Sequence, residues 1–166
     1  MEYTKKCSLS DVKELQRISQ TAYAEAFNDL IDNEDIKVYI KGKYSLDNLK
    51  KELEDTSNHF CFFCVDEQAV GYVKYIFRPS LIEIDRLYIL NSFKGLGIGT
   101  KLINAVENTA NINGKKALTL GVLELNKPAI SFYEKKGFSQ HSRGTVIIGN
   151  TEYPLLLMKK DLVLLR

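Results

Sequence analysis

The chain has 166 residues, of which 45% are hydrophobic and 27% are charged, a balance typical of one folded domain with an ordinary core. Its 23 lysines and arginines nearly balance its 21 aspartates and glutamates, so the net charge of +2 gives no indication of nucleic-acid binding. No apolar run reaches the roughly 18 residues that cross a bilayer, and Met1–Lys6 is not followed by the apolar segment of a signal peptide. We therefore expect a single soluble domain over residues 1–166, without a membrane segment or a nucleic-acid partner.

Three cysteines, an odd number, fit a reducing compartment, which indicates a cytoplasmic protein. Cys61 and Cys64 are spaced like a redox or metal pair, but they lie in an apolar run typical of a buried strand. In an extended strand their Cα atoms would lie about 10 Å apart and on opposite faces. We therefore predict no disulfide and no metal site, and we interpret His59 and His141 as structural residues.

The first half of the chain begins with a helical pattern and ends with strands. Ser10 and Asp11 can cap a helix, and apolar residues recur at helical spacing from Val12 to Ala26. An acidic stretch without lysine or arginine follows, from Glu25 to Asp35. The pattern then predicts two shorter helices and three strands of an antiparallel meander, at residues 36–40, 46–53, 60–65, 70–77 and 81–90.

The pattern changes at Phe93, where a glycine-rich loop leads into an apolar helical face. Helices are predicted at residues 98–112 and 129–136, a strand lies between them at 116–122, and two final strands cover 138–148 and 151–158. Gly149 and Asn150 suit the tight turn of a hairpin between these last strands. The order of elements predicts an α+β fold with a mixed, mostly antiparallel sheet of about seven strands.

The loop from Lys94 to Thr100 carries three glycines between a strand and a helix. Glycines there let backbone amides turn toward an anion, and the helix N-terminus adds partial positive charge. The spacing of these glycines fits neither the phosphate loop of P-loop nucleoside triphosphatases nor the G-x-G-x-x-G pattern. This argues against ATP and NAD as ligands of the loop. The loop predicts a phosphate site, and a glycine-rich turn without a ligand is the alternative.

Two motifs resemble those of the Gcn5-related N-acetyltransferases (GNAT), which transfer acetyl from acetyl-CoA to an amine. Lys94–Gly99 resembles the family's pyrophosphate loop, Gln/Arg-x-x-Gly-x-Gly/Ala, and Asn126–Phe138 resembles its Asn-x-x-Ala-x-x-x-Tyr-x-x-x-Gly-Phe segment. The resemblance implies the family's fold, with about four helices flanking the sheet, and acetyl-CoA as the cofactor without a metal. Carried onto this chain, it implies cofactor contacts from Leu87, Tyr88, Ile89, Lys94, Gly95, Leu96, Gly97, Ile98, Gly99, Thr100, Asn126 and Tyr133.

A narrower resemblance concerns the acceptor. Ala26–Asp29 and Ile82–Ile89 are similar to segments of bacterial PaiA-type acetyltransferases, which acetylate spermidine and spermine. In the acidic stretch, Glu25, Asp29 and Asp32 would then hold the ammonium groups of a polyamine, because carboxylates in a cleft concentrate cationic substrates. A solvated helix connection is the alternative interpretation of this charge run.

Acetyl transfer needs a neutral amine, yet about 99.9% of a primary alkylamine is protonated at pH 7. The family uses a strand acid as the base, and Glu83 and Asp85 share a face if the strand is regular. That face would also hold Leu87 and Ile89, whose amides the family's fold offers to the cofactor and the oxyanion. We favour Glu83, although a bulge could decide between the two acids.

Other interpretations remain open at the level of sequence. Both acids could simply form ion pairs on the strand, with Arg86 or Lys74 as partners. Tyr133 resembles the family's general acid, whose phenol protonates the departing thiolate. The acceptor could instead be a peptide N-terminus or a lysine, or the chain could be a CoA-binding regulator without catalysis. The apolar residues of Leu155–Met158 or Leu162–Leu165 could form a homodimer contact or simply complete the core.

Overall fold

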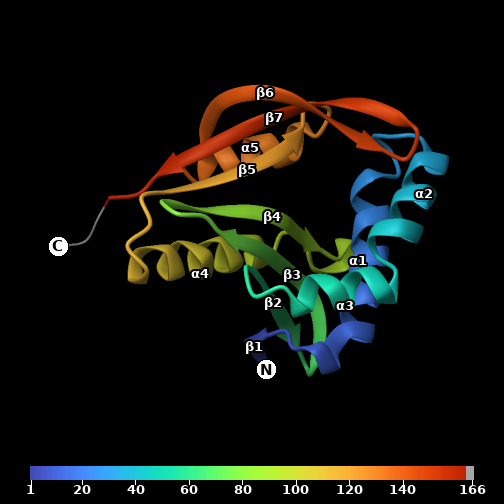
Figure 1. The fold of residues 1–166 in the computed structure, drawn as a ribbon, viewed down its shortest axis with the longest axis horizontal. Coiled ribbons are helices and arrows are strands. Elements are labelled where there is room, and N and C mark those ends of the chain that lie inside the picture. Colours follow the sequence, from blue (N-terminus) through green and yellow to red (C-terminus); the bar gives the residue numbers. More distant parts are fainter. Residues whose placement is uncertain (164–166) are drawn as a thin grey trace.

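The computed structural model describes residues 1–163, which form one seven-stranded sheet with five α-helices and two short 3-10 turns (Figure 1). The strands follow the order β1-β2-β3-β4-β5-β7-β6 across the sheet, and every neighbouring pair is antiparallel except β4 and β5. The strands are β1 (Glu2–Lys6), β2 (Asn58–Val65), β3 (Gln68–Phe77), β4 (Leu81–Ile89), β5 (Ala117–Leu123), β6 (Ser139–Ile148) and β7 (Thr151–Asp161). The helices are α1 (Val12–Phe27), α2 (Asn33–Lys43), α3 (Leu46–Glu54), α4 (Ile98–Ile112) and α5 (Lys127–Lys135), and the 3-10 turns are Leu9–Asp11 and Asn91–Phe93.

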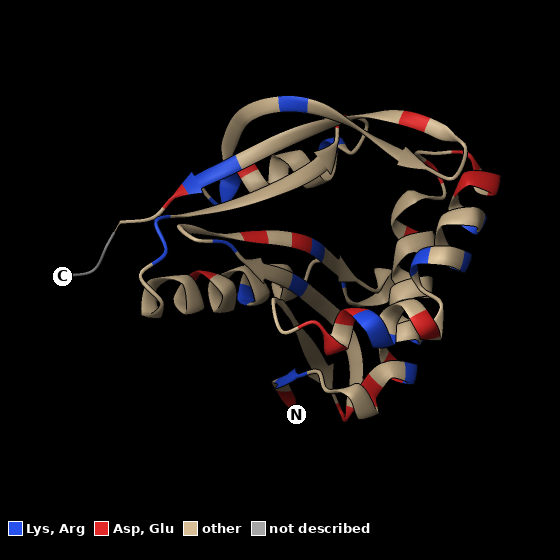
Figure 2. Ribbon diagram, viewed as in Figure 1, with Lys and Arg blue, Asp and Glu red and all other residues tan. Residues whose placement is uncertain are grey.

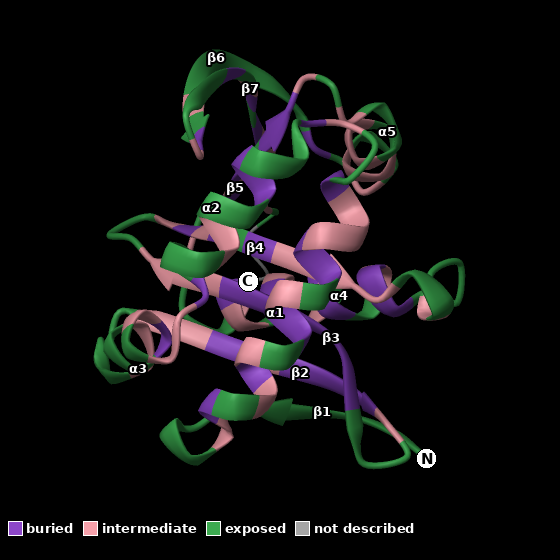
Figure 3. Cartoon of the chain, turned by 90° about the vertical axis from the view of Figure 1, so that its right-hand side faces the viewer, coloured by how far each residue is buried: buried purple, intermediate pink, exposed green. Residues whose placement is uncertain are grey.

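The mixed, mostly antiparallel sheet confirms the predicted α+β class, although the described residues hold five helices rather than about four. The sequence analysis did not predict β1. All five residues of this strand are exposed (Figure 3), so they lack an alternating apolar pattern. None of the described helices is long and apolar enough to span a membrane. Leu155–Met158 lies in β7, which pairs with β5 and β6, whereas Leu164 and Leu165 lie outside the described residues.

Two apolar clusters cover the two faces of the sheet. On one face α1 packs against β3 and β4, and its Leu15 and Ile18 are completely buried. On the other face α4 presents Leu102 and Ile103 to a second cluster that includes Ile82 of β4. The helices therefore lie on opposite sides of the central strands, because each has its apolar residues on one stripe at helical spacing.

A β-bulge interrupts β4 at Asp85. Lys74 of β3 lies opposite Arg86, but its neighbour Tyr75 lies opposite Ile84, so Asp85 is an extra residue without an opposing partner. An extra residue reverses the faces of the residues that follow. The sequence-based prediction that Glu83, Asp85, Leu87 and Ile89 share a face is therefore wrong: Leu87 and Ile89 pack with the α4 cluster, whereas Glu83 lies on the opposite face.

The sheet opens just beyond this bulge. Parallel pairing of β4 with β5 runs from Leu81 and Ala117 to Ile84 and Leu120 and then stops. Beyond that point the two strands diverge, as Figure 1 shows, while β5 continues to pair with β7 as far as Leu123. The divergence leaves one edge of β4 without a neighbouring strand in the middle of the sheet.

The hairpin of β6 and β7 is attached to α2 at its tip. The predicted turn at Gly149 and Asn150 is present, and Gly149 has a φ of +62°. The buried carboxylate of Asp35 accepts hydrogen bonds from the amide of Asn150 at 2.9 Å and from the hydroxyl of Tyr153 at 2.7 Å. A Cβ at position 149 would lie 2.5 Å from the Cα of Asp35, so only glycine allows this contact.

Candidate active site

A cavity of about 750 Å³ occupies the opening between β4 and β5. Its walls come from α1, α2, β4, the glycine-rich loop, β5, α5 and the β6–β7 hairpin. Most residues predicted from the sequence line it, namely Asp29, Asp85, Leu87, Tyr88, Ile89, Lys94, Gly95, Gly97, Ile98, Gly99, Thr100, Asn126 and Tyr133. Segments that lie far apart in the chain therefore meet in one chamber.

The glycine-rich loop forms an anion-binding end of the cavity. Gly95 and Gly97 have φ angles of +79° and +80°, in the region that favours glycine. Gly97 is the N-cap of α4 and has no side chain to bond the amides of the first turn, which remain available to an anion. A Cβ on Gly99 would lie 3.1 Å from the Phe132 ring, so this glycine lets α4 begin close against α5. The loop thus fits a diphosphate.

Backbone amides of β4 face the opening. The amide of Leu90 donates to the carbonyl of Val70 on β3 at 2.9 Å. Bonding direction alternates along an antiparallel strand, so Tyr88 also bonds toward β3 whereas Leu87 and Ile89 point their amides toward the opening. These two donors can pair with an extended amide-bearing chain or with a carbonyl oxygen that gains negative charge.

The helix α5 brings two predicted residues to the cavity. Asn126 caps α5, and its side-chain oxygen accepts a hydrogen bond from the amide of Ala129 at 3.3 Å. Tyr133 packs edge-on against Phe132 and Phe138, with ring centroids 5.3 and 5.7 Å away. Burial raises the pKa of the Tyr133 phenol well above its usual value, so the phenol keeps its proton near neutral pH and can act as a proton donor.

The end of the cavity beside α1 and α2 is aromatic. The rings of Tyr23 and Tyr39 stack with centroids 4.5 Å apart. Phe27 and Tyr88 each stand edge-on to Tyr23, and they also stand edge-on to each other. All four residues line the cavity. Of the four, the sequence analysis assigned a site role to Tyr88 alone, although Tyr23 and Phe27 lie four residues apart on the apolar face of α1.

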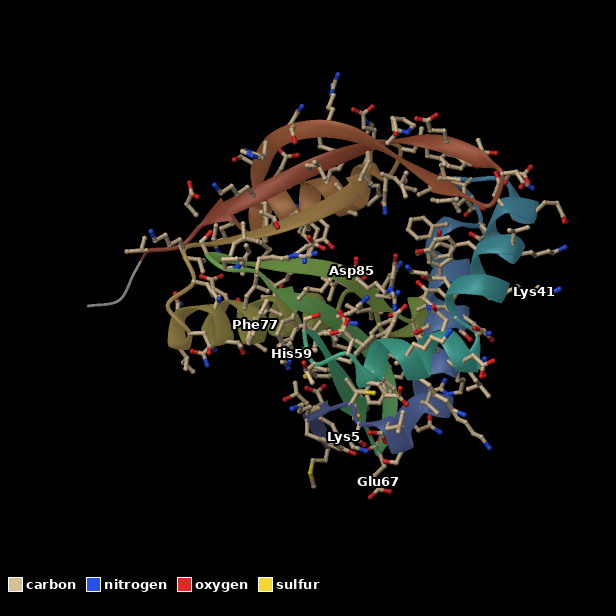
Figure 4. All side chains as sticks on the ribbon, in the orientation of Figure 1. Lys5, Lys41, His59, Glu67, Phe77 and Asp85 are labelled. Carbon is tan, nitrogen blue, oxygen red and sulfur yellow. The ribbon has the colours of Figure 1, made fainter. Side chains whose placement is uncertain are left out.

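Asp85 is the strand acid that the structure brings to this end of the cavity. Its Oδ2 atom lies 2.9 Å from Lys74 Nζ and 3.6 Å from Arg86 Nε, and its side chain remains one third exposed, at 33% (Figure 4). Burial by itself would raise the pKa of Asp85, but Lys74 and Arg86 outweigh it and hold that pKa below its usual value. Asp85 is therefore ionised near neutral pH.

Glu52 of α3, a residue that the sequence analysis did not single out, completes a cluster of four charges. Its Oε1 atom lies 3.2 Å from Lys74 Nζ and 2.8 Å from Arg86 Nη1, and its Oε2 atom accepts a hydrogen bond from Arg86 Nη2 at 2.9 Å. Figure 2 shows these acidic and basic segments of α3, β3 and β4 at the centre of the molecule. Lys74, Asp85 and Arg86 follow Glu52 by 22 to 34 residues, so no local pattern indicates that Glu52 joins them.

Four of the predicted residues do not line the cavity. Glu83, the acid that the sequence analysis favours as base, pairs with Arg78 at 3.3 Å. Glu25 accepts a hydrogen bond from the amide of Asn91 at 3.1 Å. Asp32 caps α2, where it accepts hydrogen bonds from the first-turn amides, and Leu96 is 61% exposed. Each carboxylate among them already has a partner within the fold.

Comparisons with known proteins agree with this geometry. Residues 15–138 match the model of the acetyltransferase (GNAT) family. A relative from Lactobacillus delbrueckii subsp. lactis, described as an uncharacterized N-acetyltransferase in the pepI 3' region, is 29% identical over 164 residues and covers 94% of this chain and 95% of its own. A spermidine N(1)-acetyltransferase from Thermoplasma acidophilum is 24% identical over 138 residues, covering 81% of this chain and 86% of its own.

The fold also matches solved structures. The PaiA N-acetyltransferase from Thermoplasma acidophilum, crystallised in complex with coenzyme A, superposes with a TM-score of 0.86 at 22% identity. The match covers 98% of this chain and 99% of that one. A GCN5-related N-acetyltransferase from Rhodopseudomonas palustris superposes with a TM-score of 0.83 at 21% identity, over 98% of this chain and 96% of that one. These matches confirm the predicted fold.

Proposed function

We propose a polyamine acceptor for this chain, which belongs to the acetyltransferase (GNAT) family and is an acetyl-CoA-dependent N-acetyltransferase. In the proposed reaction a primary amine attacks the thioester directly within a ternary complex. The observation that supports this best is the shape of the cavity, which connects the glycine-rich loop to an aromatic end that carries Asp29 and Asp85.

The residues at the loop end fit the cofactor. The free amides at the start of α4 and the Lys94 ammonium would hold its diphosphate, and the amides of Leu87 and Ile89 would pair with its extended arm. Bound acetyl-CoA supplies an activated acetyl group. One of these two amides, of Leu87 or Ile89, would stabilise negative charge on the acetyl oxygen, and Tyr133 would protonate the departing sulfur.

The aromatic end fits a flexible cation. Ammonium groups are attracted to aromatic rings, and the methylene segments of a polyamine can pack against the sides of Tyr23, Tyr39 and Phe27 that line the cavity. Asp85 would hold the reacting ammonium group and pass its proton to water, while Asp29 would hold a second one. Glu25 and Asp32 contribute to the negative field of the acidic stretch without lining the cavity.

The name of the Thermoplasma acidophilum relative, a spermidine N(1)-acetyltransferase, also supports the polyamine proposal. The test is thiol release from acetyl-CoA by the purified protein, with spermidine, spermine, a lysine peptide, a peptide N-terminus and an aryl amine as acceptors. We expect release with the two polyamines, and mass spectrometry of the product identifies the nitrogen that is acetylated.

The other outcomes separate the alternatives. Release with only a peptide would discard the polyamine and retain the enzyme. Coenzyme A binding without release for any amine would instead favour a CoA-binding regulator.

Asp29, which would hold the second ammonium group, offers a sharper version of this test. Asp29→Asn should raise the KM for spermine several-fold and that for a monoamine much less, because a monoamine has no second ammonium group. Asp47→Asn, an exposed acid on α3, is the matched control and should change neither value. Equal effects of Asp29→Asn on both acceptors would remove Asp29 from the proposed site.

A further inference from the structure

The charge cluster lies beneath the aromatic end of the cavity, which is the proposed acceptor end, and its charges balance. It contains two carboxylates, Glu52 and Asp85, and two cations, Lys74 and Arg86, and the four side chains come from α3, β3 and β4. Both cations are almost fully buried, with side-chain exposures of 7% and 3%. Ions buried this deeply are stable only when partners offset their charge, so each carboxylate is needed.

The two carboxylates are used differently. Glu52 has both oxygens on the cations, one of them bridging Lys74 and Arg86, and only 12% of its side chain is exposed. The shortest contacts of Asp85 with the same cations are both made by Oδ2, and its residue lines the cavity. The inner acid is therefore enclosed by its two cations, whereas the outer acid is one third exposed at the wall of the cavity.

The β-bulge explains why this arrangement exists. Because Asp85 is the extra residue of the bulge, it is adjacent to Arg86 and can reach Lys74 on the neighbouring strand without facing it in the ladder. Arg86 and Lys74 are directly opposite each other and would repel one another without the acid that bridges them from α3.

We propose that Glu52 is a positioning residue for the acceptor site, which neutralises Lys74 and Arg86 so that Asp85 can receive the cationic amine. This inference rests on the proposed function, since it requires an acceptor that binds as an ammonium ion. Without the charge of Glu52 the cluster would carry one net positive charge directly beneath the ammonium site, and Asp85 would be drawn toward its two cations.

The first test is Glu52→Gln, which keeps the size of the side chain and one acceptor oxygen and removes the negative charge. We expect the KM for spermidine to rise about tenfold, because one net charge at close range in a partly buried site is worth that much. The KM for acetyl-CoA should be unchanged, since the loop end of the cavity is built from other residues. Glu54→Gln, an exposed acid on the same helix, is the matched control and should alter neither constant.

A second test restores the charge balance. The double variant Glu52→Gln with Lys74→Met removes one charge of each sign, and it should recover most of the lost affinity for spermidine. A merely structural role for Glu52 predicts the reverse, because the double variant loses more of the cluster than the single one does. Lys74→Met alone leaves one net negative charge and should lower the KM for spermidine below the unmodified value.

Calorimetry of spermidine binding to the enzyme with coenzyme A present gives a readout that does not depend on turnover. The inference fails if Glu52→Gln leaves spermidine affinity unchanged, or if the double variant binds no better than Glu52→Gln. If Glu52→Gln does not fold, Lys74→Met still decides, since an unchanged or raised KM would overturn the inference. Absence of thiol release by the unmodified protein with every amine would instead count against the proposed function.

Discussion

The two ends of the cavity are built in different ways. The loop end uses the main chain: glycines at positive φ, the first turn of α4 and the amides of Leu87 and Ile89. The acceptor end uses side chains, namely stacked aromatic rings and the four-charge cluster. A main-chain site depends on local conformation and tolerates changes elsewhere, whereas a side-chain site depends on residues that many elements contribute.

The largest expected effect comes from the point where the two ends meet. Tyr133→Phe removes the proposed proton donor while keeping its ring contacts, and we expect kcat to fall about a hundredfold. The affinity for coenzyme A should remain within a factor of two, which calorimetry measures. Unchanged turnover would remove Tyr133 from the chemistry and leave it as a packing residue.

A smaller effect is expected at the acceptor end, where the two candidate acids can be compared directly. Asp85→Asn should lower kcat/KM for spermidine about thirtyfold, or about 2 kcal/mol, the usual range for a hydrogen bond to a charged group. Glu83→Gln should change it less than twofold, because Glu83 pairs with Arg78 and does not line the cavity. The opposite ranking would return Glu83 to the role that the sequence analysis favours.

The loop end can be tested through backbone strain alone. Gly97→Ala places a side chain at a φ of +80°, which costs about 1–2 kcal/mol, and we expect about tenfold weaker coenzyme A binding. Gly114→Ala is the matched control, because Gly114 also has a positive φ, +67°, and open space where a Cβ would lie, but does not line the cavity. Equal coenzyme A affinity in the two variants would show that the loop amides do not hold the diphosphate.

The smallest effect concerns acid stability near the acceptor end. Hydrogen bonds from Thr151, Asn150 and Tyr153 hold the pKa of Asp35 below its usual value. The ionised form therefore stabilises the fold above a pH of about 4, and this contribution is lost as the pH falls through the lower folded-state pKa. We expect Tm to fall less steeply between pH 5 and pH 3, roughly the carboxylate range, in Asp35→Asn than in the unmodified protein.

Glu152→Gln on β7, an exposed acid near the same turn, is the control for this series. Its Tm should follow the curve of the unmodified protein across the acid range. A parallel curve for Asp35→Asn as well would mean that the carboxylate of Asp35 does not contribute to the pH dependence of stability.

The difference between a site built from the main chain and a site built from side chains also explains which features could be predicted from the sequence. The glycine-rich loop, the turn at Gly149 and Asn150 and the order of the predicted helices and strands follow from local patterns, and all of them are present. The cluster around Glu52 and the stack of Tyr23 on Tyr39 depend on long-range packing, which no local spacing encodes. The exposed strand β1 has no apolar signal because it lies at the edge of the sheet.

The bulge at Asp85 is an intermediate case. The apolar positions of β4 are even-numbered at Ile82 and Ile84 but odd-numbered at Leu87 and Ile89. A regular strand would keep one parity, so this switch is a readable sign of an extra residue between the two pairs. The shared face required a regular strand, so it is absent here, and the bulge is the feature that separates the two candidate acids.

The β6–β7 hairpin, which is attached to α2 at its tip, offers a way to change which amine the protein accepts. The hairpin carries Val146, Ile148 and Leu155 into the acceptor end and contributes none of the glycine-rich loop. An engineer could therefore exchange the hairpin for one with a different inner surface and leave the cofactor end intact. Such a graft would have to keep the glycine of its turn and the tyrosine that faces Asp35, since those two residues fix where the new surface is placed.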